Sequence, residues 1–79
     1  MIHGIYVKSK PKGKWYLVSV AISAEVANND VVAALNKAKQ EGNDLAEASV
    51  HTFQSGFYIP ESLIEVNSKT MYNWCLFTQ

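Results

Sequence analysis

Two apolar runs in the first part of the sequence flank a lysine-rich stretch that contains one proline and one glycine. The first run covers residues 2–7, the second covers residues 15–22, and residues 8–14 lie between them. Proline and glycine inside such a stretch favour a turn, while β-branched and aromatic residues on either side favour strands. The sequence therefore predicts an antiparallel β-hairpin.

The second predicted strand is apolar on both of its faces. One face holds Tyr16, Val18, Val20 and Ile22, and the other holds Trp15, Leu17, Ser19 and Ala21. A strand with one face in water normally carries polar residues on that face. We therefore expect this strand to lie centrally in the sheet, or its second face to be covered by something other than solvent.

The apolar period changes to a helical one after residue 22. Residues 23–41 are rich in alanine, and four of their apolar residues are spaced to form one stripe: Val31, Val32, Leu35 and Ala38. Ser23 would cap a helix that begins at residue 24, whereas Asn28 or Asn29 would cap a shorter one. The following Gly42 favours a helix end near Glu41.

Three further segments complete the predicted fold. Residues 48–54 alternate like a strand, residues 56–66 are left open between loop, strand and short helix, and residues 70–78 are predicted as a last strand. The element order is then β-β-α-β-β. This order predicts the α+β class, with a small antiparallel sheet and one main helix packed on one face.

The predicted C-terminal strand carries the expected interface. Its apolar side chains divide between two faces, with Tyr72, Trp74 and Leu76 on one and Met71, Cys75 and Phe77 on the other. One helix covers only one face of a sheet, so the second face would pack against another molecule. We therefore predict a homodimer that uses these aromatic and apolar residues.

The size and charge of the chain agree with self-association. Its 79 residues are expected to form a single domain, 1–79, whose small core is near the lower limit for independent stability. One cysteine cannot form an internal disulfide, and no apolar run is long enough for a membrane span. We expect a cytoplasmic protein, and its net charge of zero leaves little repulsion between copies.

The lysine-rich stretch is a candidate nucleic-acid interface. It contains Lys8, Lys10, Lys12 and Lys14, and it is followed by Trp15 and Tyr16. Lysines neutralise phosphates and aromatic rings stack on bases, which is the combination used for single strands. The alternative is a solvated loop whose lysines keep the hairpin edge from pairing with other chains. The absence of arginine and the balanced total charge predict weak binding.

Few residues have the chemistry of a catalytic or metal site. His3, His51 and Cys75 come from distant segments, and no local motif connects them. We expect a core role for Cys75 and a partly buried position for His51, in a hydrogen bond with a neighbour. The sequence predicts no enzyme activity, no cofactor and no metal.

Three functions follow from these observations, in decreasing order of support. The first is a homodimeric protein–protein interaction module that is not an enzyme, and whose protein partner is unknown. The second is a weak nucleic-acid-binding module that uses the lysine-rich hairpin. The third is small-molecule binding in a groove between helix and sheet, with polar contacts from His51 and Tyr58.

Overall fold

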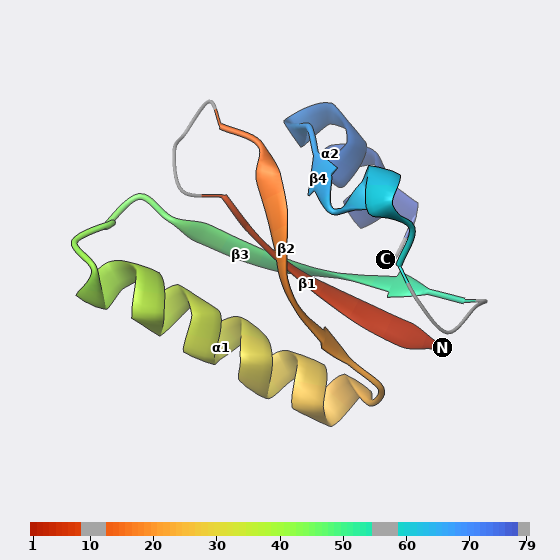
Figure 1. The fold of residues 1–79 in the computed structure, drawn as a ribbon, viewed down its shortest axis with the longest axis horizontal. Helices are drawn as coiled ribbons and strands as arrows, with labels where there is room; N and C mark the ends of the chain where they lie inside the picture. Colours follow the sequence, from red (N-terminus) through yellow and green to blue (C-terminus); the bar gives the residue numbers. More distant parts are fainter. Residues whose placement is uncertain (9–12, 55–58, 78–79) are drawn as a thin grey trace.

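The computed structural model describes residues 1–8, 13–54 and 59–77. Four strands form one sheet, namely β1 (Ile2–Lys8), β2 (Trp15–Ala21), β3 (Glu47–Phe53) and the short β4 (Glu65–Val66). Two α-helices, α1 (Ala24–Gln40) and α2 (Ser68–Phe77), and one 3₁₀ turn, η1 (Glu61–Leu63), complete the described part of the chain (Figure 1). The α+β class and the antiparallel sheet are confirmed.

The strand β1 is the centre of the sheet, whose order is β3-β1-β2-β4. It pairs antiparallel with β2 on one side, as the hairpin prediction requires, and with β3 on the other. Six of its seven residues are buried. The strand β2, expected either to lie centrally or to have its second face covered, is the other inner strand, although its outer neighbour β4 pairs only with Trp15 and Tyr16.

The helix α1 takes the longer of the two alternatives left open by the sequence, with Ser23 as its cap, and ends next to Glu41 as predicted. The Ser23 hydroxyl oxygen accepts a hydrogen bond from the Val26 N–H at 3.2 Å, which is an N-cap interaction. At the other end Gly42 has a φ of 89°, a backbone conformation that favours glycine. Of the predicted stripe, Val31 packs against the sheet and Ala38 faces β2, whereas Val32 is 59% exposed.

The two helices lie on opposite faces of the sheet, and each covers its own apolar cluster (Figure 1). On one face Ile5 and Ala21 pack against Ala27 of α1. On the other face Tyr6 and Trp15 pack against residues of β4 and α2, namely Val66 and Met71. Because side chains alternate along β1, this single strand contributes to both clusters.

The predicted strand over residues 70–78 is wrong, because this segment forms the helix α2. The Asn67 carboxamide oxygen accepts a hydrogen bond from the Thr70 N–H at 2.8 Å, so Asn67 caps the start of the helix. The helix buries Met71, which is 3% exposed, and turns Tyr72 outward, 64% exposed. The fourth strand is therefore Glu65–Val66, within the segment left open, and a second helix ends the fold.

The Tyr6 side chain anchors the second cluster to the segment before β4. It is fully buried, and its hydroxyl donates a hydrogen bond to the Leu63 carbonyl oxygen at 2.7 Å. Burial raises the pKa of Tyr6 to about 12, so the hydroxyl keeps its proton and stays a donor at neutral pH.

Candidate functional site

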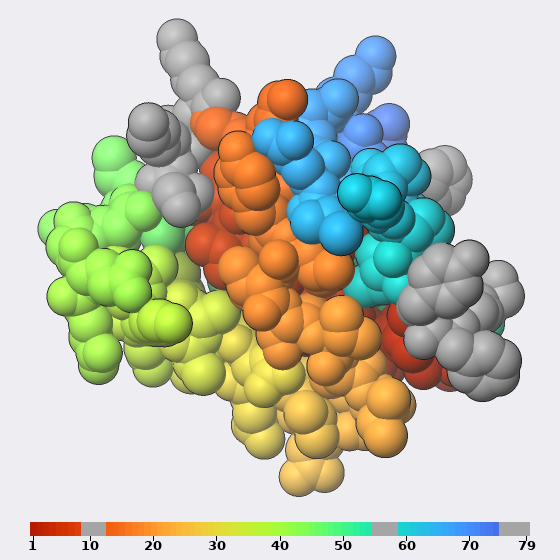
Figure 2. Space-filling view, in the orientation of Figure 1, coloured from red at the N-terminus to blue at the C-terminus, as the bar shows by residue number. Residues whose placement is uncertain are grey.

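The largest uncovered apolar surface of a strand in the described part of the chain belongs to β2 and the residue after it. The side chains that form it are Tyr16, 48% exposed, Val18, 53%, Val20, 50%, and Ile22, 84%. We call these four side chains the β2 stripe. Figure 2 shows β2 uncovered across the front of the molecule, between α1 and the segments that follow residue 59. The four side chains do not share one face as the sequence predicts, because Val18 lines the space under α1 with Val7, whereas Val20 pairs with Gly4, whose Cβ direction is toward Tyr6 and Leu17 on the opposite face.

The β2 stripe is exposed because only the first part of β2 has an outer neighbour. β4 pairs with Trp15 and Tyr16, and the Leu17 N–H donates to the Ile64 carbonyl oxygen at 2.8 Å. Beyond Leu17 no strand of the described chain pairs with the outer side of β2, so residues 18–21 form an open edge. Such an edge presents unpaired backbone groups to which another strand can bind.

A bulge in β2 marks the beginning of this open edge. Ile5 pairs with Ser19 and Tyr6 pairs with Leu17, so Val18 is an extra residue with no partner on β1. A bulge bends a strand and increases its local twist. It leaves both Val18 and Ser19 among the residues that face α1.

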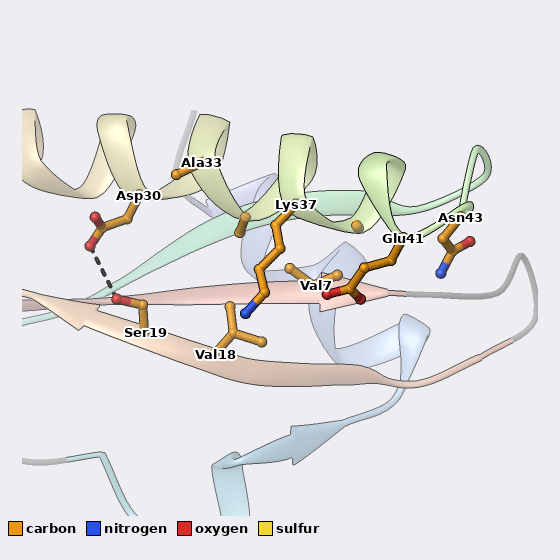
Figure 3. Close-up of a pocket in the computed structure, with 10 residues that line it drawn as sticks. Val7, Val18, Ser19, Asp30, Ala33, Lys37, Glu41 and Asn43 are labelled. Atoms are coloured by element: carbon orange, nitrogen blue, oxygen red, sulfur yellow. Dashed lines mark hydrogen bonds between the residues drawn. The ribbon is translucent and has the colours of Figure 1, made fainter.

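A groove of about 470 Å³ separates α1 from β2 beside the β2 stripe. Its floor is formed by Val7, Val18 and Ser19. Its wall comes from α1, through Asp30, Ala33, Ala34, Lys37, Ala38 and Glu41, and Asn43 lies at one end (Figure 3). Alanines on the wall keep the groove open, because their side chains do not reach across to β2. We call this space the α1 groove.

Of the charged side chains that line the α1 groove, one has a hydrogen-bond partner and two have none within the described residues. The Asp30 carboxylate accepts a hydrogen bond from the Ser19 hydroxyl at 3.1 Å. Lys37 extends from α1 toward Val18, and Glu41 extends toward Val7 (Figure 3). Within the described residues, the side chains of Lys37 and Glu41 form no ion pair and no hydrogen bond. One cation and one anion are therefore available to an occupant of the groove.

The residues predicted as the dimer interface do not form two strand faces, because α2 is a helix. Met71 and Trp74 face the sheet, where the Trp74 ring lies 5.6 Å from that of Tyr6 and 5.9 Å from that of Phe53. Tyr72 points to solvent. The side chains of Cys75, Leu76 and Phe77 lie outside the described part of the chain. The apolar content of this segment is thus explained in part by the core of the chain itself.

His51 stacks on Trp74, and it lies on the face opposite α1. The two rings are 3.9 Å apart with an interplanar angle of 17°, and Phe53 meets His51 edge-on at 4.6 Å. The expected hydrogen bond is not found at its Nδ1 atom, which is buried and has no partner among the described residues. Removal from solvent lowers the pKa of His51, because burial disfavours the charged imidazolium.

We expect this histidine to make the protein less stable in mild acid. A depressed pKa means that the unfolded chain binds the proton first, so the free energy of unfolding falls as pH drops below 6.5 through the folded-state pKa. The variant His51→Phe keeps an aromatic ring against Trp74 and removes this titration. Urea unfolding from about pH 7.5 to about pH 4.5 measures this effect. The free energy of unfolding should fall less steeply with decreasing pH for the variant than for the wild type. Parallel curves would contradict the prediction.

The lysine-rich hairpin is partly committed to contacts within the chain. The Lys8 ammonium lies 2.9 Å from the Glu47 carboxylate and 5.3 Å from the centroid of the Trp15 ring. Lys14 lies 3.7 Å from Glu65, whose hydrogen bond with Tyr16 raises the pKa of that phenol. Trp15 is 8% exposed, so its ring is not available for stacking on a base. Lys10 and Lys12 lie outside the described residues, and the nucleic-acid interface stays a hypothesis.

The groove expected for a small molecule exists, but its predicted polar contacts do not line it. His51 lies on the other face of the sheet, and Tyr58 lies outside the described residues. Within the described ranges, no three side chains of His, Cys, Asp or Glu are grouped closely enough to hold a metal ion. Among the same residues, no helix combines the length and the apolar character needed to cross a membrane.

One sequence feature pointed to this site, namely the apolar residues on both faces of β2. Four of them prove to be exposed, and the bulge at Val18 divides them between the two faces. Lys37 and Glu41 looked like ordinary polar residues of a helix surface, and only the packing of α1 beside β2 places them in a groove. No protein-family model matches the sequence, and neither a curated protein nor a solved structure matches it.

Proposed function

We propose that this protein is a docking module that binds another polypeptide through the β2 stripe and the adjoining open edge. The observation that carries the proposal is that Tyr16, Val18, Val20 and Ile22 expose large side chains, and that β2 has no outer neighbour beyond Leu17 among the described residues. Addition of a strand to a sheet edge uses the backbone for affinity and neighbouring side-chain pockets for specificity. The proposal keeps the protein–protein interaction expected from the sequence and moves it from residues 70–78 to β2.

A second copy of the chain is one polypeptide that fits this description. Homodimerisation and a cytoplasmic location remain predictions. The earlier support for a dimer, a strand apolar on both faces at residues 70–78, no longer holds, because those residues form α2. If two copies associate, the β2 stripe is the surface that we expect them to bury.

A displayed library of random peptides tests the docking function directly. We expect selection on the wild-type protein to enrich peptides whose binding falls at least about tenfold when Val18 and Val20 are both replaced by lysine, because two exposed apolar contacts become charged. The matched control is Val32→Lys, since Val32 is also about half exposed but lies on α1 away from the groove. This control should bind like the wild type.

Light scattering after size exclusion, applied to the same variants, tests whether the partner is a second copy of the chain. A dimer that becomes monomeric in the double lysine variant, and persists with Val32→Lys, would support docking through β2. A dimer that survives the double substitution would contradict it. The proposal also fails if the library yields no binding peptide, or yields peptides that bind the double variant as well as the wild type.

A further inference from the structure

In the described part of the chain, the outer edge of β2 lacks a neighbouring strand over only part of its length. This limits the path that a docked segment can follow. All three strand pairs of the described sheet are antiparallel, and a strand added in the same way to residues 18–21 runs from the end of β2 toward its start. At Leu17 it meets β4 and the hydrogen bond from the Leu17 N–H to the Ile64 carbonyl oxygen. The edge is blocked there, so the segment must leave it.

Only one of the two faces of the sheet offers room at that point. The face that carries Tyr6 is filled by Leu63, Val66 and Met71. The face that carries Val18 opens into the α1 groove, about 470 Å³ in volume (Figure 3). The segment therefore continues from the open edge into the α1 groove.

The helix α1 runs antiparallel to β2, so the segment runs parallel to α1 (Figure 3). Along that direction it passes Lys37 and then Glu41. These residues are four positions apart on the helix, which corresponds to a rise of about 6 Å. Side chains two positions apart on an extended segment point to the same side and are separated by about 6.6 Å. The spacing of Lys37 and Glu41 along α1 therefore matches the spacing of two alternate residues of the segment. One of these residues can contact Lys37 and the other Glu41.

We propose that the docked polypeptide is an extended segment in which an acidic residue is followed, two positions later, by a basic residue. The acidic side chain faces Lys37 and the basic side chain faces Glu41. The reverse order would place like charges together, which disfavours binding and so selects the order as well as the composition. This inference rests on the docking function proposed above and adds to it the charge pattern and direction of the partner.

Two designed peptides with a fluorescent label provide the probe. The first is acetyl-Thr-Val-Thr-Val-Glu-Thr-Lys-Val-Thr-amide, whose first four residues can pair with residues 18–21, and the second exchanges its glutamate and lysine. Fluorescence anisotropy should show the wild-type protein binding the first peptide roughly tenfold more tightly, since each exposed ion pair changes affinity a few-fold at most. The preference should shrink as salt is raised.

A charge exchange in the protein supplies the matched variant. In the double variant Lys37→Glu with Glu41→Lys, the preference between the two peptides should invert, because both contacts are reversed together. A second double variant, Lys37→Gln with Glu41→Gln, should bind both peptides equally. Both residues are exposed on α1, and far-UV circular dichroism checks that the helix content is unchanged.

The outcomes separate this inference from the docking function. Equal binding of the two peptides by the wild type, lost when Val18 and Val20 become lysine, overturns the charge pattern and leaves the docking function standing. A preference that the exchanged variant does not invert also overturns the charge pattern. If neither peptide binds the wild type, the inference fails, while the library selection decides the docking function on its own.

Discussion

Replacing Trp74 with alanine is expected to lower the free energy of unfolding by about 3 kcal/mol, as large-to-small substitutions of packed aromatic residues do. The Trp74 ring stacks on His51 at 3.9 Å and contacts Tyr6 and Phe53. It is the aromatic side chain through which the described part of α2 holds to the sheet. For a chain of 79 residues such a loss is a large share of the total stability.

Urea unfolding followed by far-UV circular dichroism measures this effect, with Tyr72→Ala as the matched control. Tyr72 is the next aromatic residue on α2 but is 64% exposed, so its replacement should change the free energy of unfolding by less than about 0.5 kcal/mol. A strand over the same residues would place both side chains on one face, and the two variants would then behave alike. Equal effects would contradict the helical assignment of α2.

Replacing Tyr6 with alanine is expected to cost about 3–5 kcal/mol, enough to leave a chain of this size largely unfolded at 25 °C. The Tyr6 ring is fully buried in the centre of the second cluster. Its removal would leave a void between β1 and α2 and would also remove the donor to the Leu63 carbonyl oxygen.

The variant Tyr6→Phe separates the ring from its hydroxyl. It keeps the packing and leaves the Leu63 carbonyl without its 2.7 Å hydrogen bond, so we expect a loss of about 1–2 kcal/mol. The same urea titration measures both variants. If phenylalanine cost as much as alanine, the hydrogen bond rather than the ring would hold the cluster together, contrary to what burial indicates.

The elements that depend on neighbouring residues were predictable from the sequence. The hairpin follows from proline and glycine between two β-branched runs, and α1 follows from its helical period, from Ser23 before it and from Gly42 after it. The hairpin strands and the end of α1 agree with the structure within one residue, and the start of α1 is the one capped by Ser23 rather than the alternative at Asn28 or Asn29. Local turn and capping chemistry is enough to set such boundaries.

The C-terminal segment was not predictable in the same way, because it is apolar at nearly every position. A short apolar run fits a strand and a buried helix about equally well by periodicity alone. Met71 and Trp74 are spaced for one face of a helix, but the aromatic content of the segment favours a strand, and only a strand was predicted. What decides the matter is the chain around the segment, namely the cap from Asn67 and the cluster around Tyr6.

The candidate site was predictable only in part, for a related reason. The apolar alternation of β2 is a local pattern, but it does not reveal the bulge at Val18 that divides these side chains between two faces. The α1 groove depends on how α1 packs beside β2, and this packing arises from contacts between distant residues. Lys37 and Glu41 therefore gain their place only in the folded chain.

The sharing of β1 between two separate clusters has a consequence for how this protein can change over evolutionary time. Ile5 and Tyr6 are neighbours in sequence, but Ile5 packs under α1 and Tyr6 packs under α2. A substitution at Ile5 is therefore compensated by changes in α1, and one at Tyr6 by changes in residues 63–74. Adjacent positions of β1 should thus vary independently of each other, and each should covary with a different, distant part of the chain.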